Sequence, residues 1–388
     1  MRDLAPFTRE ARALLALGLP IIGSNLAQIA MHITDTVMLG WYEVAALAAV
    51  VLAASFWFVL FLLGAGFAWA VMPMVAAADA RGDDREVRRI TRMGLWLSVL
   101  FAAAVMPLMW FSGTLLLALG QQPDLAAAAQ DYLRIAGWGM FPALLVMVLK
   151  SYLAAQERTQ VVLWITLLGA VLNAALNWAL IFGNWGAPEL GLIGAAIATL
   201  AMQLFTLVLT LGYTAWLPAL RRHELFARFW RPDWSAFAAV FRLGMPIGLT
   251  SLAEAGLFTA TALMMGWVGT RELAAHGIAL EIASATFMIH LGLSNAATVR
   301  AGQAHGRGDR LRLRLVARTA IGLSMLFALV TVAVFLSLPE QLVRLFLDAS
   351  DPEAPAIVAI GVRLLAVAAL FQLADAGQVM ALGLLRGV

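Results

Sequence analysis

Residues 17–40 read LGLPIIGSNLAQIAMHITDTVMLG, and residues 243–266 read LGMPIGLTSLAEAGLFTATALMMG with the same spacing and no gap. At the same offset, Arg81-Gly82-Asp83 matches Arg307-Gly308-Asp309, so the register holds far beyond the first helix. Such a long match indicates that the chain is an internal duplication. The two copies carry their acids at different places, because Asp35 has no acidic equivalent and Glu254 is opposite a glutamine.

The composition predicts an all-α integral membrane protein. Hydrophobic residues make up 62% of the chain and charged residues 13%, which leaves too little polar surface to cover a soluble globule. Apolar stretches of about 20 residues cross a bilayer as helices. The sequence predicts ten of them, at 13–40, 45–75, 93–119, 132–155, 160–183, 190–216, 239–268, 273–299, 316–338 and 356–385. The polar alternation of an outer-membrane barrel is absent from the sequence.

The basic residues predict the orientation in the membrane. Most of the 26 Lys and Arg residues lie near the N-terminus or in the stretches 81–92, 221–242 and 300–318, which fall on one side of the predicted spans. Positively charged loops stay in the cytoplasm, so we expect a multi-pass protein of the bacterial inner (plasma) membrane with a cytoplasmic N-terminus. The pI near 9.8 then reflects topology and does not indicate a nucleic-acid partner. The chain has no cysteine, which excludes thiolate metal sites and a cysteine nucleophile.

The duplication predicts two lobes. Residues 1–216 hold six spans, residues 217–240 form a basic cytoplasmic linker, and residues 241–388 hold four spans. Because an even number of spans precedes the second copy, both copies enter the membrane from the same side, as parallel repeats. Residues 160–216 have no counterpart in the second copy. The chain is therefore either a fragment lacking two final helices, which we favour, or a ten-helix variant.

The first predicted helix carries a polar stripe. Asn25, Gln28, His32 and Asp35 follow one another at i, i+3, i+7 and i+10, which places them on one helix face. A charged side chain at the centre of a membrane helix costs about 2.5–3.5 kcal/mol on the insertion scale, so such a residue is retained for function or neutralised by a partner. The stripe favours a cavity-facing surface. The alternative is an interfacial aspartate capped by backbone groups.

The second lobe carries two acids on different helices. Glu254 lies near the middle of its span with no Lys or Arg close in sequence, and Asp375 lies between Gln372 and Gln378 at three-residue spacing. Two carboxylates in an apolar environment can share a proton or a cation, because they cannot both stay ionised without a counter-charge. We therefore predict Glu254 and Asp375 as a pair that binds Na+ or H+. A neutral glutamic acid bonded to a neighbouring helix is the alternative.

Further polar residues lie inside the predicted spans. Asn173 and Asn177, at i and i+4, offer amide oxygens to the first lobe's interior or hold helices together. Glu281 and His290 in the eighth span are additional members of a possible proton relay. Lys150 lies in the last third of its span, from which we expect it to reach the membrane surface.

The sequence holds no phosphate-binding loop, histidine pair with metal spacing or nucleophile elbow. Nothing in it indicates ATP hydrolysis or a bound cofactor, so an ion gradient would have to drive any transport. An integral-membrane enzyme acting on lipid is an open alternative. It would need a catalytic cluster near one interface, whereas the ionisable residues here are scattered singly on helix faces.

Three stretches together resemble the multidrug and toxic compound extrusion (MATE) family. They are LPIIGSNLAQIAMHITDTVMLG at 19–40, GAPELGLIGAAIAT at 186–199 and AAHGIALEIASATFMIHLGLSNAATVRAGQAHGRGD at 274–309. Together with the parallel duplication, the resemblance covers essentially the whole chain. Asn177 stands where another branch of the family has an acid, so the chain is most similar to the NorM-like branch.

The resemblance implies two helical bundles, alternating access and Na+- or H+-coupled export of organic cations by a monomer. It implies cation or proton binding at Asp35, Glu254 and Asp375. A lipid-linked oligosaccharide flippase of related architecture is the second reading. We expect such a flippase to line its cavity with several arginines, whereas only Arg134 and Arg363 lie inside the predicted spans away from their cytoplasmic ends.

Overall fold

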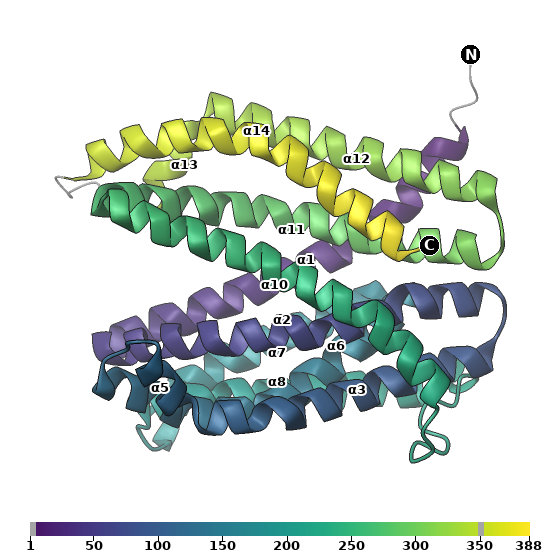
Figure 1. Cartoon of the computed structure of the whole chain (residues 1–388), viewed down its shortest axis with the longest axis horizontal. Helices are drawn as coiled ribbons and strands as arrows, with labels where there is room; N and C mark the ends of the chain where they lie inside the picture. The colour runs from purple at the N-terminus through teal and green to yellow at the C-terminus, as the bar shows by residue number, and fades with distance from the viewer. Residues whose placement is uncertain (1–4, 348–352) are drawn as a thin grey trace. The chain divides into compact units, whose positions relative to one another are not determined.

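The computed structural model describes residues 5–347 and 353–388, and every regular element in these ranges is a helix. In these ranges, ten helical segments are long and apolar enough to cross a membrane. The all-α membrane fold predicted from composition is thereby confirmed. The longer helices are α1 (Ala5–Tyr42), α2 (Val44–Ala80), α3 (Asp84–Trp110), α5 (Pro123–Ala136), α6 (Met140–Ala155), α7 (Thr159–Phe182), α8 (Gly191–Trp216), α10 (Trp234–Val268), α11 (Thr270–Gly306), α12 (Arg310–Ser337) and α14 (Ala354–Arg386) (Figure 1).

The helices group into two compact units. Among the described residues, 23–252 form one, which we call the N unit, and 5–22 with 253–347 and 353–388 form the other, which we call the C unit. Helix α1 therefore changes unit after Ile22, and α10 changes unit after Leu252. The lobes predicted at 1–216 and 241–388, with the linker at 217–240, follow the sequence repeat rather than these two units. Their boundaries stay a prediction.

The N unit is built around α2, which packs against α3, α5 and α6, while α8 packs against α5, α6 and α7. Its core contains fully buried Leu39, Leu133 and Leu144. Helices α2 and α10 approach closely at glycines: a Cβ added to Gly66 would lie 2.5 Å from the backbone nitrogen of Gly248. Small residues allow such close backbone contact between membrane helices, where packing rather than hydrophobic burial drives association.

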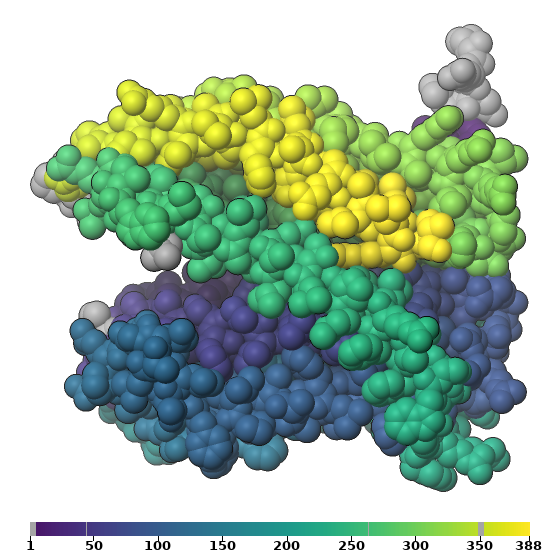
Figure 2. All heavy atoms as spheres, in the orientation of Figure 1, coloured from purple at the N-terminus to yellow at the C-terminus, as the bar shows by residue number. Residues whose placement is uncertain are grey.

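The C unit is built around α14, which runs along α11 and α12 (Figures 1 and 2). Two hydroxyls of α11 bond to backbone carbonyls of α14. The Ser294 hydroxyl donates to the Val379 carbonyl at 2.7 Å, and the Thr298 hydroxyl donates to the Gly383 carbonyl at 2.8 Å. Hydroxyl bonds of this kind hold helices together where no water is available to compete.

A buried ion pair holds the first part of α1 in the C unit. The Arg300 guanidinium on α11 donates from Nε to Oε1 of Glu10 at 2.7 Å and from its NH2 group to Oε2 at 2.9 Å. The side chains of Arg300 and Glu10 are only 10% and 7% exposed. The two parallel bonds match the fork of the guanidinium to the carboxylate, which is the strongest geometry for such a pair.

The duplication is visible in equivalent turns. Helices α2 and α11 are each 37 residues long. Each is followed by a glycine with positive φ, 74° at Gly82 and 68° at Gly308, a backbone conformation that glycine adopts without strain. The aspartate after each glycine then caps the next helix, because Asp83 and Asp309 each accept a backbone N–H three residues on at 2.9 Å.

The helix ends differ from the predicted spans. The span predicted at 93–119 is helix α3, which begins earlier at Asp84 and ends at Trp110, followed by the separate short helix α4 (Ser112–Ala118). Hydropathy marks only the part of a helix that lies in hydrocarbon, and the charged first turns of α3 extend beyond it. The span predicted at 132–155 belongs to α5 and α6, which a 3₁₀ turn at Gly137–Gly139 separates.

Candidate functional site

An acid–amide contact joins α10 and α14 in the C unit. Gln378 Nε2 donates to Oε1 of Glu254 at 2.8 Å. Asp375 lies one turn before Gln378 on α14, is 7% exposed, and interacts electrostatically with Glu254. Arg386, near the end of α14, also interacts with the charge of Glu254. One arginine cannot neutralise two acids, so this arrangement suits the binding of one further proton or cation.

The surroundings of the two acids supply an additional acceptor. Gln372 Nε2 donates to the Thr286 hydroxyl at 2.8 Å, while the buried Oε1 of Gln372 has no partner among the described residues. Phe258 and Phe371 pack edge to face with ring centroids 6.2 Å apart. Glu281 is exposed and makes no hydrogen bond or ion pair within the part of the chain that the structure describes. The participation of Glu281 in the ion site stays a prediction.

His290 is a buried titratable group of the same unit. Its side chain is 1% exposed, and its Nδ1 lies 3.0 Å from the Ser324 hydroxyl. That hydroxyl in turn lies 3.3 Å from the carbonyl of Ala376, the residue after Asp375. Within residues 5–347 and 353–388, His290 Nε2 has no hydrogen-bond partner.

The first acid lies in the N unit against two asparagines of α7. Asn177 Nδ2 donates to Oδ1 of Asp35 at 2.5 Å and lies 3.3 Å from Oδ1 of Asn173. The Oδ1 atom of Asn177 is buried and has no partner among the described residues. A carboxylate oxygen beside amide oxygens is a ligand set that hard cations prefer. Tyr132, which no sequence pattern singled out, is 7% exposed and interacts electrostatically with Asp35.

The rest of the polar stripe on α1 is not buried uniformly. Asn25 and Asp35 are half-buried, whereas Gln28 and His32 are exposed. Nδ2 of Asn25 is itself buried and has no partner among the residues that the structure describes. Of the four stripe residues, only Asp35 makes a hydrogen bond to another helix in this part of the chain.

Contrary to the prediction from sequence, Lys150 does not extend to the membrane surface. Its Nζ donates to the Thr166 hydroxyl of α7 at 3.1 Å, and that hydroxyl lies 2.9 Å from the hydroxyl of Ser24 on α1. The short side chains of Ser24 and Thr166 leave room for the ammonium to bond within the unit. The expected extension to the surface is therefore wrong.

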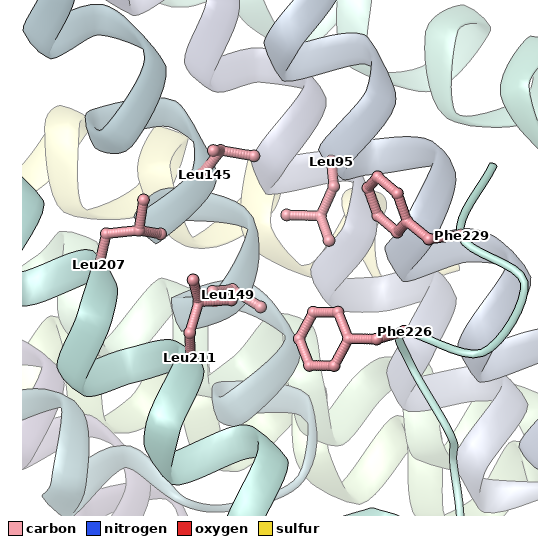
Figure 3. A pocket seen from close by; sticks show the side chains of 7 residues that line it. All are labelled: Leu95, Leu145, Leu149, Leu207, Leu211, Phe226 and Phe229. Atoms are coloured by element: carbon pink, nitrogen blue, oxygen red, sulfur yellow. The ribbon is translucent and has the colours of Figure 1, made fainter.

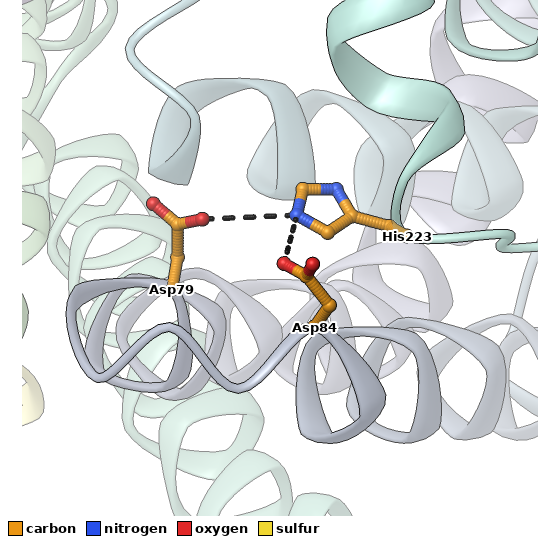
Figure 4. A group of neighbouring side chains, drawn as sticks. All are labelled: Asp79, Asp84 and His223. Atoms are coloured by element: carbon orange, nitrogen blue, oxygen red, sulfur yellow. Dashed lines mark ion pairs between the residues drawn. The ribbon is translucent and has the colours of Figure 1, made fainter.

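A cluster of two aspartates and a histidine lies where α2 ends and α3 begins (Figure 4). His223 Nε2 is 3.7 Å from Asp79 Oδ1 and 3.3 Å from Asp84 Oδ1, and its Nδ1 is 2.6 Å from the Tyr152 hydroxyl. Although three such groups can hold a metal ion, Arg222 already contributes a positive charge, bonding to Asp79 at 2.7 Å. We interpret the cluster as an attachment point for the loop that carries Arg222 and His223.

That loop, residues 217–233, joins the two sequence repeats, and we call it the inter-repeat loop. It is anchored to α3 by Arg88, which pairs with Glu224 at 2.6 Å, and by Arg89, which pairs with Asp233. The Trp96 indole also donates to the Phe229 carbonyl at 3.1 Å. The hydrogen bond from Arg89 holds the pKa of Asp233 well below its usual range. In the sequence these arginines are visible only as signals of membrane topology.

The sequence of this chain is similar to those of a known family. Residues 20–179 and 246–388 match the family model described as MatE. The chain is 48% identical over 377 residues to "Probable multidrug resistance protein NorM" of Rhizobium meliloti (strain 1021), covering 97% of this chain and 81% of that relative. A relative of the same name from Agrobacterium fabrum is 42% identical, with the same coverage.

Solved structures share the fold. A eukaryotic MATE transporter, AtDTX14, superposes with a TM-score of 0.86 at 20% identity, covering 98% of this chain and 84% of that one. An outward-facing multidrug resistance MATE transporter of the MOP superfamily superposes with a TM-score of 0.84 at 21% identity, covering 100% of this chain and 86% of that one. At such identities the likeness concerns the fold alone.

Proposed function

Because this chain belongs to the MATE family, in which its NorM-like relatives are multidrug resistance proteins, we propose that it exports organic cations in exchange for Na+ or H+. Members of the family are transporters rather than enzymes, so the lipid-modifying enzyme considered from sequence is not retained. A multi-pass protein of the bacterial inner membrane with small-molecule substrates agrees with this assignment. The cytoplasmic N-terminus and the monomeric state are part of the proposal.

The observation that carries the coupling proposal is the contact between Glu254 and Gln378 beside buried Asp375. A proton or Na+ that neutralises these acids changes which contacts α10 and α14 make, because Gln378 bonds differently to a carboxylate and to a protonated or ion-bound carboxyl group. An ion that binds one state of the transporter better than another shifts the balance between the states. Coupling therefore follows from ion occupancy at this contact.

Asp35 is proposed as the substrate-responsive acid or a second ion site. Its carboxylate shares Asn177 Nδ2, while the unpartnered Oδ1 of Asn177 remains available as a ligand. A carboxylate in surroundings of low dielectric attracts an organic cation strongly. The two acid sites lie in different units, so substrate and coupling ion need not compete for the same atoms.

The test is ethidium efflux from proteoliposomes under an imposed Na+ gradient, an H+ gradient, or neither. We expect Glu254→Gln and Asp375→Asn each to abolish gradient-driven efflux while the purified variants keep their helical content. Glu340→Gln removes an exposed acid on α13 (Pro339–Arg344) and serves as the matched control, with efflux unchanged. Wild-type efflux rates in both acid variants would refute coupling through this pair. The two gradients applied separately identify the ion.

A further inference from the structure

An apolar groove lies in the N unit beside the inter-repeat loop. Leucines of α3, α6 and α8 form its walls, and Phe226 and Phe229 of the loop lie across one side (Figure 3). The cavity has a volume of about 210 Å³, and every residue that lines it is Leu or Phe. A groove lined only by such side chains is stabilised when apolar groups rather than water cover it. The groove is therefore suited to a hydrocarbon ligand.

The depth of the groove matches the outer part of a bilayer's hydrocarbon layer. Leu211 lies five residues before the end of α8, and Leu149 lies six residues before the end of α6. At 1.5 Å per residue, both lie roughly 8–9 Å inside the helix ends. Phe226, at the loop side, is 40% exposed, so the groove is not sealed from outside. In a membrane protein, acyl chains are the apolar molecules present at this depth.

A buried arginine that forms no salt bridge among the described residues lies close to the groove, where α3 meets the inter-repeat loop. Arg92 is one turn before groove residue Leu95 on α3, and its NH1 group donates to the Arg228 carbonyl at 3.0 Å. Arg92 is 8% exposed, and its Nε has no hydrogen-bond partner among the described residues. Arg88 and Arg89 form salt bridges with acids, whereas within residues 5–347 and 353–388 no carboxylate forms a salt bridge with Arg92. Asp233 attracts Arg92 only from a longer distance and is already bonded to Arg89. The arginines therefore outnumber the acids at this end of the groove, which favours an anion that binds there.

The loop surface around this end resembles a membrane interface. Trp230 and Trp234 are 73% and 68% exposed, and Arg228 and Arg231 are exposed beside them. Exposed tryptophans collect at the level of lipid headgroups, and nearby arginines attract anionic lipids. The apolar groove, the buried Arg92 and the exposed tryptophans of the loop thus correspond in chemistry to an acyl chain, a phosphate and a headgroup region.

We propose that the N unit binds an anionic phospholipid, with one acyl chain in the Leu/Phe groove and its phosphate at Arg92 and Arg228. The bound lipid covers the groove and adds negative charge at an end where arginines outnumber acids. This binding site is separate from the acids proposed to couple transport, so the lipid site and the proposed function succeed or fail independently.

The test uses the purified full chain in nanodiscs that contain phosphatidylglycerol or phosphatidylcholine with a photoactivatable diazirine in one acyl chain. Cross-linked peptides are identified by mass spectrometry. We expect phosphatidylglycerol to label peptides containing residues 207–211 and 226–229 at least about fivefold more than phosphatidylcholine, since each arginine near the surface favours anionic lipid by about that factor. Equal labelling by the two lipids, or labelling spread evenly over all exposed helices, would refute the site.

Matched variants separate the acyl chain from the headgroup. Leu207→Trp fills the groove and is expected to remove labelling at 226–229, whereas Val208→Trp, at a neighbouring position that is 64% exposed and outside the groove, leaves it unchanged. If Leu207→Trp does not fold, Leu211→Phe is the milder variant that fills the groove. Unchanged labelling in a folded filling variant counts against the groove.

The headgroup is tested in the same way. Arg92→Gln is expected to reduce the preference for phosphatidylglycerol about fivefold, and Arg85→Gln, which removes an exposed arginine of the same helix, leaves the preference intact. An unchanged preference in Arg92→Gln would contradict the phosphate assignment. Displacement of the lipid label by ethidium would assign the groove to transported compounds instead, and would also overturn the proposal.

Discussion

Removal of Arg300 is expected to destabilise the C unit strongly. Arg300→Met retains much of the side-chain volume but leaves the Glu10 carboxylate, 7% exposed, without its ion partner. The two charge-assisted hydrogen bonds contribute about 1.5–3 kcal/mol each. Breaking a buried ion pair by removing one partner costs about 3–5 kcal/mol in measured cases, which agrees with that sum. We therefore expect a loss of about 3–5 kcal/mol of unfolding free energy.

Two further variants show whether the loss comes from the unpaired charge. The double variant Glu10→Gln with Arg300→Met removes the remaining charge, so it should be more stable than Arg300→Met alone. Arg344→Met breaks the pair with Glu340, whose side chains are 62% and 55% exposed. Exposed pairs contribute about 0–1 kcal/mol, so this matched control should unfold almost like the wild type.

The assay is unfolding in mixed micelles of increasing SDS content, followed by circular dichroism. A loss below about 1 kcal/mol for Arg300→Met, similar to that of an exposed pair, would refute the reasoning. A double variant as unstable as the single variant would also refute it, because the cost would then come from lost packing rather than from a stranded charge.

Two other predictions follow from the N unit. Gly66→Ala places a methyl group against the Gly248 backbone and should cost about 1–3 kcal/mol in the same SDS titration, whereas Gly212→Ala, with open space around its Cβ, should gain about 0.5–1 kcal/mol; equal effects would contradict the close approach. The hydrogen bond from Arg89 lowers the pKa of Asp233 in the folded protein. Its contribution to anchoring the inter-repeat loop is therefore complete above the usual pKa of about 3.9, begins to decrease below it, and is lost as the pH falls through the lowered pKa. Hydrogen exchange of residues 224–233, corrected for intrinsic rates, should rise in the wild type below about pH 4, and in Asp233→Asn it should already be raised at neutral pH.

The fold was largely predictable because membrane insertion and duplication leave strong patterns in sequence. The offset between the copies predicts that α2 and α11 correspond, and the structure gives both helices the same length. Helix ends were less predictable. Asp84 and the basic residues after it are polar enough to lie outside a hydropathy window, yet Asp83 caps a helix that includes them.

The residues of the candidate site could be selected from sequence, but their contacts could not. Helical spacing places Gln372, Asp375 and Gln378 on one side of α14, whereas the bond from Gln378 to Glu254 depends on how α10 crosses α14. That crossing is set by tertiary packing between residues more than a hundred positions apart. The role of Glu254 and Asp375 in ion coupling stays a prediction.

The contacts of the inter-repeat loop could not be predicted from sequence either. Arg88 and Arg89 were counted as signals of membrane orientation, which is a statistical property of loops. Their partners Glu224 and Asp233 lie in a different segment of the chain, and no local pattern connects the two segments. The buried position of Arg92, on which the proposed lipid site depends, has the same origin.

The ion pair between Glu10 and Arg300 also sets an order of events during synthesis. The two residues are 290 positions apart in the chain. At about 5–20 residues per second, the ribosome completes Arg300 roughly 15–60 s after Glu10. During that interval the first turns of α1 have no finished C unit to pack into. The segment that carries Glu10 thus reaches its final position only after a helix that is made much later.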